Sequence, residues 1–127
     1  MELLLDTHAL IWFLDGDDST SVKVKREIEN LENSKIVSIA SIWEIAIKIS
    51  LGKLRFSNGF THFLNLLEEN GFEILPITFE HVIVLSSLDF IRRDPFDTLL
   101  VSQCIANQLT IATKDENIRK YNIQTIW

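Results

Sequence analysis

A run of three leucines near the N-terminus constrains the fold more than any other feature of the chain. Leu3, Leu4 and Leu5 are followed directly by the polar residues Asp6 and Thr7. A short apolar run that ends in a polar turn is typical of a β-strand covered on both faces, and such strands occur in parallel sheets. In open parallel sheets, ligands bind where strands end and helices begin. Asp6 therefore marks a candidate site.

The rest of the chain predicts an alternation of helices and strands. Apolar spacing and turn residues predict further strands at about 36–38, 72–77, 110–113 and 123–127, the second of these at or near a sheet edge. Helices are expected at about 7–14, 19–33, 41–51, 60–69, 79–90 and 95–108. This order favours an α/β fold, a three-layer α/β/α sandwich whose central sheet is mainly parallel.

Length and composition predict one globular domain that spans residues 1–127. The N-terminus lacks the pattern of a signal peptide and no apolar run approaches 18 residues, so we expect a cytoplasmic protein without a membrane segment. A net charge of −6 argues against a surface that is basic throughout, but it allows a nuclease with a local acidic site. Cys104 is the only cysteine and is expected to be a small core residue.

Four acidic residues occupy equivalent places, at a strand end or in the first turn of the following helix: Asp6, Glu44, Asp97 and Asp115. A sandwich of this kind brings such positions to one edge of the sheet. Four carboxylates in a small cleft would repel one another unless cations lay between them. An all-oxygen site of this type suits Mg²⁺ or Mn²⁺.

Helix capping is the alternative interpretation of each acidic residue. Ser41 with the glutamate three positions later resembles a capping box, and so do Asp94 and Asp97. Asp115 could cap a short helix through Ile118. Capping explains each residue singly, whereas their common placement favours a shared site.

Basic residues and histidines are weaker candidates. Lys48 follows the second acidic residue by four positions, a spacing more typical of a surface ion pair than of a substrate contact. Arg92 and Arg93 could meet phosphate, with solvated charge as the alternative. His62 and His81 are expected on helix surfaces, and no spacing joins the three histidines into a zinc site.

Five segments stand in an order and approximate spacing that is specific in combination: residues 4–8 (LLDTH), 41–48 (SIWEIAIK), 52–54 (GKL), 93–97 (RDPFD) and 113–115 (TKD). In these segments, and over nearly its whole length, the chain resembles PIN-domain ribonucleases. Within that family it resembles the VapC toxins of bacterial VapBC toxin–antitoxin pairs. One position departs from the pattern, because Thr98 stands where similar sequences often carry a basic residue.

The resemblance implies a Mg²⁺- or Mn²⁺-dependent endoribonuclease, the toxin of a type II toxin–antitoxin system. It implies that Asp6, Glu44, Asp97 and Asp115 are the catalytic residues and metal ligands, with Thr113 nearby. Water activated by metal would hydrolyse RNA phosphodiester bonds. The implied partners are the RNA substrate, a cognate antitoxin that covers the cleft, and a second copy of the chain in a homodimer.

Apolar side chains on the predicted helix 41–51 give a separate reason to expect a homodimer. Trp43, Ile47 and Leu51 lie off the core stripe of their predicted helix, and exposed apolar patches commonly mark interfaces.

Two other functions compete with the nuclease. The first alternative is a catalytically silent PIN-fold module that binds a partner protein. The second is a phosphate-accepting receiver domain, which would need an acceptor aspartate on a middle strand, and residues 36–38 offer none.

Overall fold

The computed structural model describes residues 1–89 and 94–127. Its five strands form one sheet in the order β3-β2-β1-β4-β5, and every neighbouring pair is parallel. The predicted strands are all present, with the third at one edge. Their bounds are β1 (Glu2–Leu5), β2 (Ser34–Ser38), β3 (Glu73–Leu75), β4 (Thr110–Ala112) and β5 (Gln124–Ile126).

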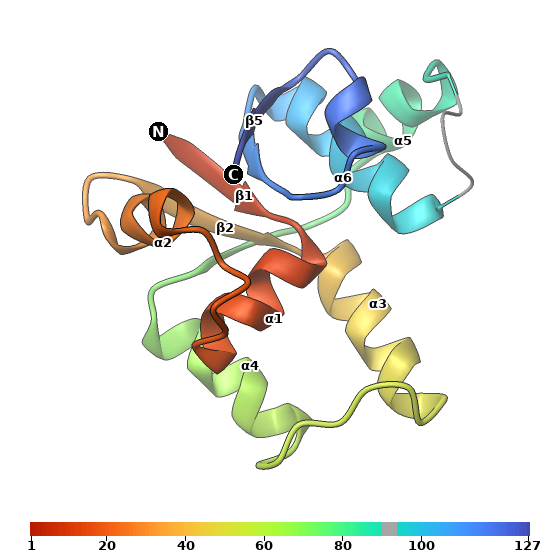
Figure 1. Cartoon of the computed structure of the whole chain (residues 1–127). Helices are drawn as coiled ribbons and strands as arrows, with labels where there is room; N and C mark the ends of the chain where they lie inside the picture. Colours follow the sequence, from red (N-terminus) through yellow and green to blue (C-terminus); the bar gives the residue numbers. More distant parts are fainter. Residues whose placement is uncertain (90–93) are drawn as a thin grey trace.

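Helices cover both faces of the sheet, which confirms the three-layer sandwich. Figure 1 shows α1, α2 and α4 on one side of the sheet and α5 and α6 on the other. The bounds are α1 (Thr7–Asp15), α2 (Val22–Glu29), α3 (Ile39–Ser50), α4 (Phe60–Glu69), α5 (Phe79–Ser86), α6 (Pro95–Asn107) and the 3₁₀ turn η1 (Ile118–Lys120). None of these helices is long and apolar enough to cross a bilayer.

The three leucines of β1 divide between the two cores of the sandwich. Leu3 and Leu5 belong to the cluster that α1, α2 and α4 cover, whereas Leu4 packs against residues of α6 and β4 on the other face. All three side chains are fully buried. Burial of each contributes roughly 1.5–3 kcal/mol relative to exposure, so this strand is held firmly at the centre of the sheet.

Three helix boundaries differ from the sequence prediction, and one of them is the end of α5, at Ser86 rather than at about residue 90. The other two have local reasons. Helix α3 begins at Ile39, earlier than expected, because the Ser38 hydroxyl accepts a hydrogen bond from the N–H of Ala40 at 3.0 Å. Helix α2 ends at Glu29, and the Asn30 side chain accepts from the N–H of Glu32 at 3.0 Å in a turn that continues no helix. Leu31 lies in this turn and is 95% exposed.

The carboxyl ends of β1 and β4 form the point where the strand order reverses. From β1 the sheet continues through β2 on one side and through β4 on the other. The N–H of Asp6 donates to the carbonyl of Ala112 at 3.1 Å, so the residues after β1 and after β4 lie side by side. Open α/β sheets bind ligands at such a switch point.

Candidate functional site

Asp6 is held in place from both sides of the switch point. It is the N-cap of α1, where Oδ1 accepts from the N–H of Ala9 at 2.8 Å. Its Oδ2 accepts from the hydroxyl of Thr113 at 2.6 Å, and both side chains are buried. Burial raises the pKa of Asp6, although the Thr113 and Ala9 hydrogen bonds and the nearby His8 lower it in part. An ionised carboxylate has about four acceptor sites, so Asp6 retains acceptor capacity.

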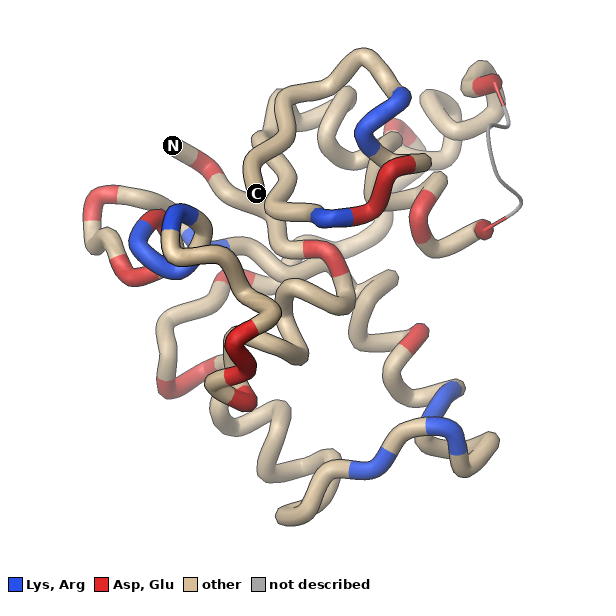
Figure 2. The backbone as a smooth tube through the Cα atoms, viewed as in Figure 1, with Lys and Arg blue, Asp and Glu red and all other residues tan. Residues whose placement is uncertain are grey.

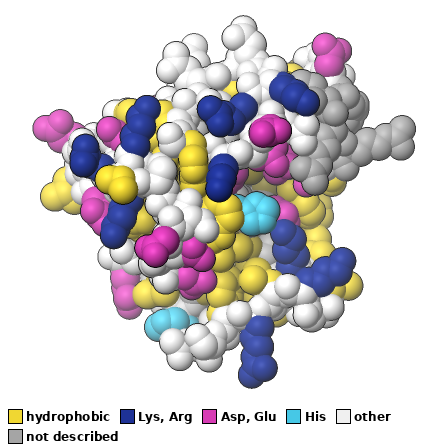
Figure 3. All heavy atoms as spheres, viewed as in Figure 1, with side chains coloured by type: hydrophobic (Ala, Val, Ile, Leu, Met, Phe, Trp, Pro, Cys, Tyr) yellow, Lys and Arg dark blue, Asp and Glu magenta, His cyan; other side chains and the backbone are white. Residues whose placement is uncertain are grey.

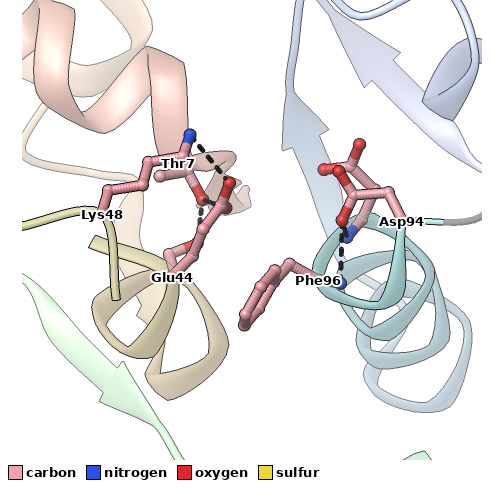
Figure 4. A network of polar contacts seen from close by, with 7 residues as sticks. Thr7, Glu44, Lys48, Asp94 and Phe96 are labelled. Carbon is pink, nitrogen blue, oxygen red and sulfur yellow. Dashed lines mark hydrogen bonds and ion pairs between the residues drawn. The ribbon is translucent and has the colours of Figure 1, made fainter. Parts of the chain in front are cut away.

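Glu44 lies in the second turn of α3 rather than at its start. Because the helix begins at Ile39, Ser41 is not its N-cap and the predicted capping box at Glu44 is wrong. The carboxylate points instead toward α1, where Oε1 accepts from the hydroxyl of Thr7 at 2.7 Å. Its Oε2 lies 3.1 Å from Nζ of Lys48, the ion pair that the spacing predicted. Figure 4 shows this group across from Asp94 and Phe96 of the α6 start.

Asp94 and Asp97 share the start of α6, and Asp94 does the capping. Its Oδ1 accepts from the N–H of Phe96 at 3.0 Å and from that of Asp97 at 3.2 Å, while Pro95 occupies the first turn. The side chain of Asp97 therefore has a different environment. Its pKa rises from 3.8 to about 7, first because the group is buried and then because other carboxylates surround it.

The charges that act on Asp97 show which residues come together. In decreasing order they belong to Asp94, Asp115, Glu44 and Asp6. Thus the other three acidic residues singled out in the sequence all lie within electrostatic reach of Asp97. The four residues come from the end of β1, the second turn of α3, the first turn of α6 and the segment that follows β4.

Asp115 combines the two interpretations that the sequence left open. Its Oδ1 accepts from the N–H groups of Asn117 at 2.8 Å and Ile118 at 3.0 Å, as the capping prediction stated. Its charge nevertheless raises the pKa of both Asp6 and Asp97. Asp115 therefore both binds backbone N–H groups at a helix start and belongs to the acidic cluster.

The side chains of the acidic cluster are chemically suited to a hard divalent cation, because such ions prefer carboxylate oxygens as ligands. The hydroxyl groups of Thr7 and Thr113 donate hydrogen bonds to two of these carboxylates. Within residues 1–89 and 94–127, however, no three His, Cys, Asp or Glu side chains are arranged as a group that could hold a metal ion. Like charges repel when no cation lies between them, and local contacts compensate several of these carboxylates, whereas Asp97 has only pKa-raising surroundings. Lys48 compensates Glu44, and backbone N–H groups compensate Asp6, Asp94 and Asp115.

Two contributors to the cluster were missed in the sequence. Asp94 was interpreted only as a cap, although its charge raises the pKa of Asp97 more than any other neighbouring charge does. Thr7 follows Asp6 directly and binds Glu44, a role that no local pattern signals because the two residues are 37 positions apart. Thr98 is buried and its hydroxyl donates to the carbonyl of Asp94 at 2.8 Å, so it serves the helix start.

The remaining candidates lie away from the cluster or outside the described residues. Arg92 and Arg93, the predicted phosphate contacts, fall outside the described residues. Cys104 is buried in the core, as expected, and burial raises its pKa to about 12. His81 was expected on a helix surface, but it is buried, and its Nδ1 accepts from the N–H of Thr78 at 3.1 Å in the cap of α5.

The family model described as the PIN domain matches residues 3–124. This chain belongs to the PIN domain family. No curated protein sequence matches it. The fold of this PIN domain is similar to several solved structures at low sequence identity.

Two of these structures come from VapBC complexes. VapBC2 from Rickettsia felis, bound to a DNA fragment from its promoter, matches with a TM-score of 0.76 and 16% identity over 100% of this chain and 99% of that chain. VapBC-1 from nontypeable Haemophilus influenzae matches with a TM-score of 0.73 and 14% identity over 99% of this chain and 97% of that chain. A third structure, the PIN domain endonuclease Utp24, matches with a TM-score of 0.52 and 18% identity over 93% of this chain and 74% of that chain.

Proposed function

We propose that this PIN domain is a Mg²⁺- or Mn²⁺-dependent endoribonuclease that acts as the toxin of a type II toxin–antitoxin pair. The observation that carries the proposal is the convergence of charge on Asp97 from Asp6, Glu44 and Asp115, three residues that lie far apart in the sequence. Such a cluster is unfavourable without a cation and is suited to holding one. The fold likeness to the VapBC complexes supports the toxin assignment and an antitoxin as partner.

The side chains of Asp6, Glu44, Asp97 and Asp115 would hold the ion or ions. A bound divalent cation lowers the pKa of water and offsets charge on the scissile phosphate and the leaving oxygen. Hydroxyl groups of the chain orient two of the carboxylates without neutralising them: Thr113 acts on Asp6 and Thr7 acts on Glu44. The pKa of Asp97 is raised to about 7, so in the metal-free protein its carboxyl keeps a proton to a higher pH than an ordinary aspartate does.

Cleavage of a labelled RNA by the purified protein tests the proposal. We expect cleavage with Mn²⁺ or Mg²⁺, none in EDTA, and none by Asp6→Asn. Asp18→Asn is the matched control, because Asp18 is exposed and lies outside the cluster. The products should carry a 5′-phosphate and a 3′-hydroxyl, since water attacks the phosphorus. A 2′,3′-cyclic phosphate, or full activity in EDTA, would overturn the mechanism.

A catalytically silent module that binds a partner protein is the second candidate. The observation in its favour is that Glu44 already has a cation, the Lys48 ammonium at 3.1 Å, and that the described acidic side chains form no ready metal group. Under this function the protein would cleave no RNA with any divalent cation, and Asp6→Asn would bind the partner as the wild type does.

A further inference from the structure

The charges of the chain are unevenly distributed around the acidic cluster. Residues 45–67 contain no Asp or Glu, although the chain as a whole carries a net charge of −6. The same segment contains Lys48, Lys53 and Arg55. It comprises the end of α3, the following loop and most of α4. A local positive surface therefore directly adjoins the most acidic part of the molecule.

The three basic residues, here called the basic strip, follow one another along the chain from the side of Glu44. Lys48 lies one helical turn beyond Glu44 and its Nζ is 3.1 Å from Oε2 of that residue. The chain then turns at Gly52, whose φ of 72° favours glycine, and the N–H of Lys53 donates to the carbonyl of Lys48 at 2.8 Å. Figure 2 shows the blue segments following one another along the end of α3 and the loop.

Solvent reaches the far part of the strip more readily than its start. Lys53 and Arg55 are exposed, whereas Lys48 is half-buried in its ion pair with Glu44. In the part of the chain that the structure describes, Lys48 is the only lysine or arginine paired with a carboxylate. Figure 3 shows dark-blue side chains at several places on this face, among them the right side, where they lie beside a histidine and acidic side chains, and the lower edge.

We propose that Lys48, Lys53 and Arg55 form a phosphate-binding strip along which single-stranded RNA continues from the acidic cluster. This inference rests on the proposed function and adds the path of the substrate. A polyanion must approach carboxylates that repel it, and an adjacent basic surface provides the attraction that brings it there. Because Lys48 is engaged by Glu44, Lys53 and Arg55 carry most of the phosphate contacts.

A cavity at the far end of the strip fits this path. Arg55 lines it together with Phe56, Asn58 and His62, and its volume is about 350 Å³. Ligand pockets of this size combine apolar or aromatic walls with a few polar groups. A nucleobase next to the phosphate at Arg55 would find an aromatic ring and an amide there. Asp15 also lines the cavity, so phosphate is favoured on the Arg55 side.

The test compares two double variants with the same change in net charge. Lys53→Gln/Arg55→Gln removes the strip, and Lys23→Gln/Lys25→Gln removes two exposed charges of α2 at the same spacing. Binding of a fluorescent single-stranded RNA is measured in EDTA as a function of salt. The same variants are compared by kcat/KM for RNA cleavage with Mn²⁺.

The salt dependence of RNA binding gives the expected size of the loss in affinity. Each phosphate contact on a single strand contributes about 0.7 to the log–log salt slope, so loss of two contacts reduces the slope by about 1.4. With equal affinity at 1 M salt, this corresponds to roughly 25-fold weaker binding at 0.1 M, in the strip variant alone. The same change is expected in kcat/KM.

Three other results would overturn the strip, and they separate it from the proposed function. If the wild type cleaves RNA and both variants match it in binding and kcat/KM, the strip is wrong and the nuclease stands. If both variants weaken equally, general charge is responsible and the strip is again wrong. If the wild type neither binds nor cleaves RNA, the proposed function fails and the strip fails with it.

Discussion

The indole of Trp43 meets the ring of Phe96 edge to face, with 5.1 Å between the ring centroids and 79° between the planes. Trp43 directly precedes Glu44 and Phe96 directly precedes Asp97, so this contact joins α3 to α6 beside two residues of the acidic cluster. Figure 4 shows Phe96 directed into the space between the two halves of the site. The aromatic pair therefore fixes the separation of two carboxylates that repel each other.

Removal of this contact should change the acidity of the cluster. Trp43→Ala should lower the pKa of Asp97 from about 7 toward its ordinary value, because water enters and Glu44 moves away. The pair itself is worth about 0.5–1.5 kcal/mol of stability. Carboxyl NMR titration of the metal-free protein measures the shift, and Trp43→Phe, which keeps an aromatic ring, is the control. An unchanged pKa in Trp43→Ala would refute the role of the pair.

The metal-free protein should lose stability as the pH rises. The unfolded chain releases the Asp97 proton near pH 4 and the folded chain near pH 7. Between these values the folded state binds more protons, so the free energy of unfolding decreases as the pH increases. The raised pKa of Asp6 acts in the same direction.

Asp97→Asn should therefore raise the melting temperature in EDTA at pH 8 by a few degrees and change it little at pH 4. Asp94→Asn is the comparison at the same helix start, where a weakened cap should cost stability at both pH values. A loss of stability in Asp97→Asn at pH 8 would contradict the repulsion.

Manganese should stabilise the wild type. A ligand at a hundredfold excess over its Kd adds about 2.7 kcal/mol, which corresponds to a rise of several degrees in melting temperature. Asp97→Asn should shrink that rise, because it removes one of the proposed ligands. Thermal melts of both proteins with and without Mn²⁺ provide the measurement. No response in the wild type would leave the four acidic residues without a metal role.

The hydroxyl of Thr113 should matter more than its methyl group. Thr113→Val leaves the buried carboxylate of Asp6 without its 2.6 Å donor, which should cost about 1–3 kcal/mol and raise the pKa of Asp6 further. Urea denaturation measures the loss. Thr113→Ser restores the donor and should recover most of the stability. A larger loss in Thr113→Ser than in Thr113→Val would point to packing of the methyl group instead.

A homodimer should depend on the exposed side of α3. Trp43 is 54% exposed and Leu51 is 62% exposed, with Ile47 between them at the spacing of one helical stripe. Light scattering should find a dimer, and Leu51→Glu should weaken it. Leu31→Glu, at an exposed leucine distant in sequence, should leave it intact. A wild type that is monomeric at all accessible concentrations would exclude this interface.

The sequence was sufficient where a feature depends on neighbouring residues or on sheet topology. Leu3 to Leu5 predicted a buried strand, and the end of that strand predicted the place of Asp6. The start of α3 was missed because both Ser38 and Ser41 can cap a helix, and only the pairing of β2 with β1 and β3 carries the strand to Ser38.

Long-range contacts account for the rest. His81 is buried because Nε2 lies 2.7 Å from Oδ1 of Asn107, a contact between α5 and α6 that spans 26 residues. The effect of Asp94 on Asp97 is also invisible in a capping pattern, since the same carboxylate both caps the helix and repels its neighbour.

The position of β4 next to β1 sets the order in which the site can be completed during synthesis. Asp6 is among the first residues to leave the ribosome, but the strand that pairs with β1 on one side begins at Thr110. Until that strand is inserted, Thr113 cannot orient Asp6, and Asp115 is absent from the cluster. A growing or truncated chain that ends before β4 therefore contains Asp6, Glu44 and Asp97 but lacks Asp115 and Thr113, so its site is incomplete.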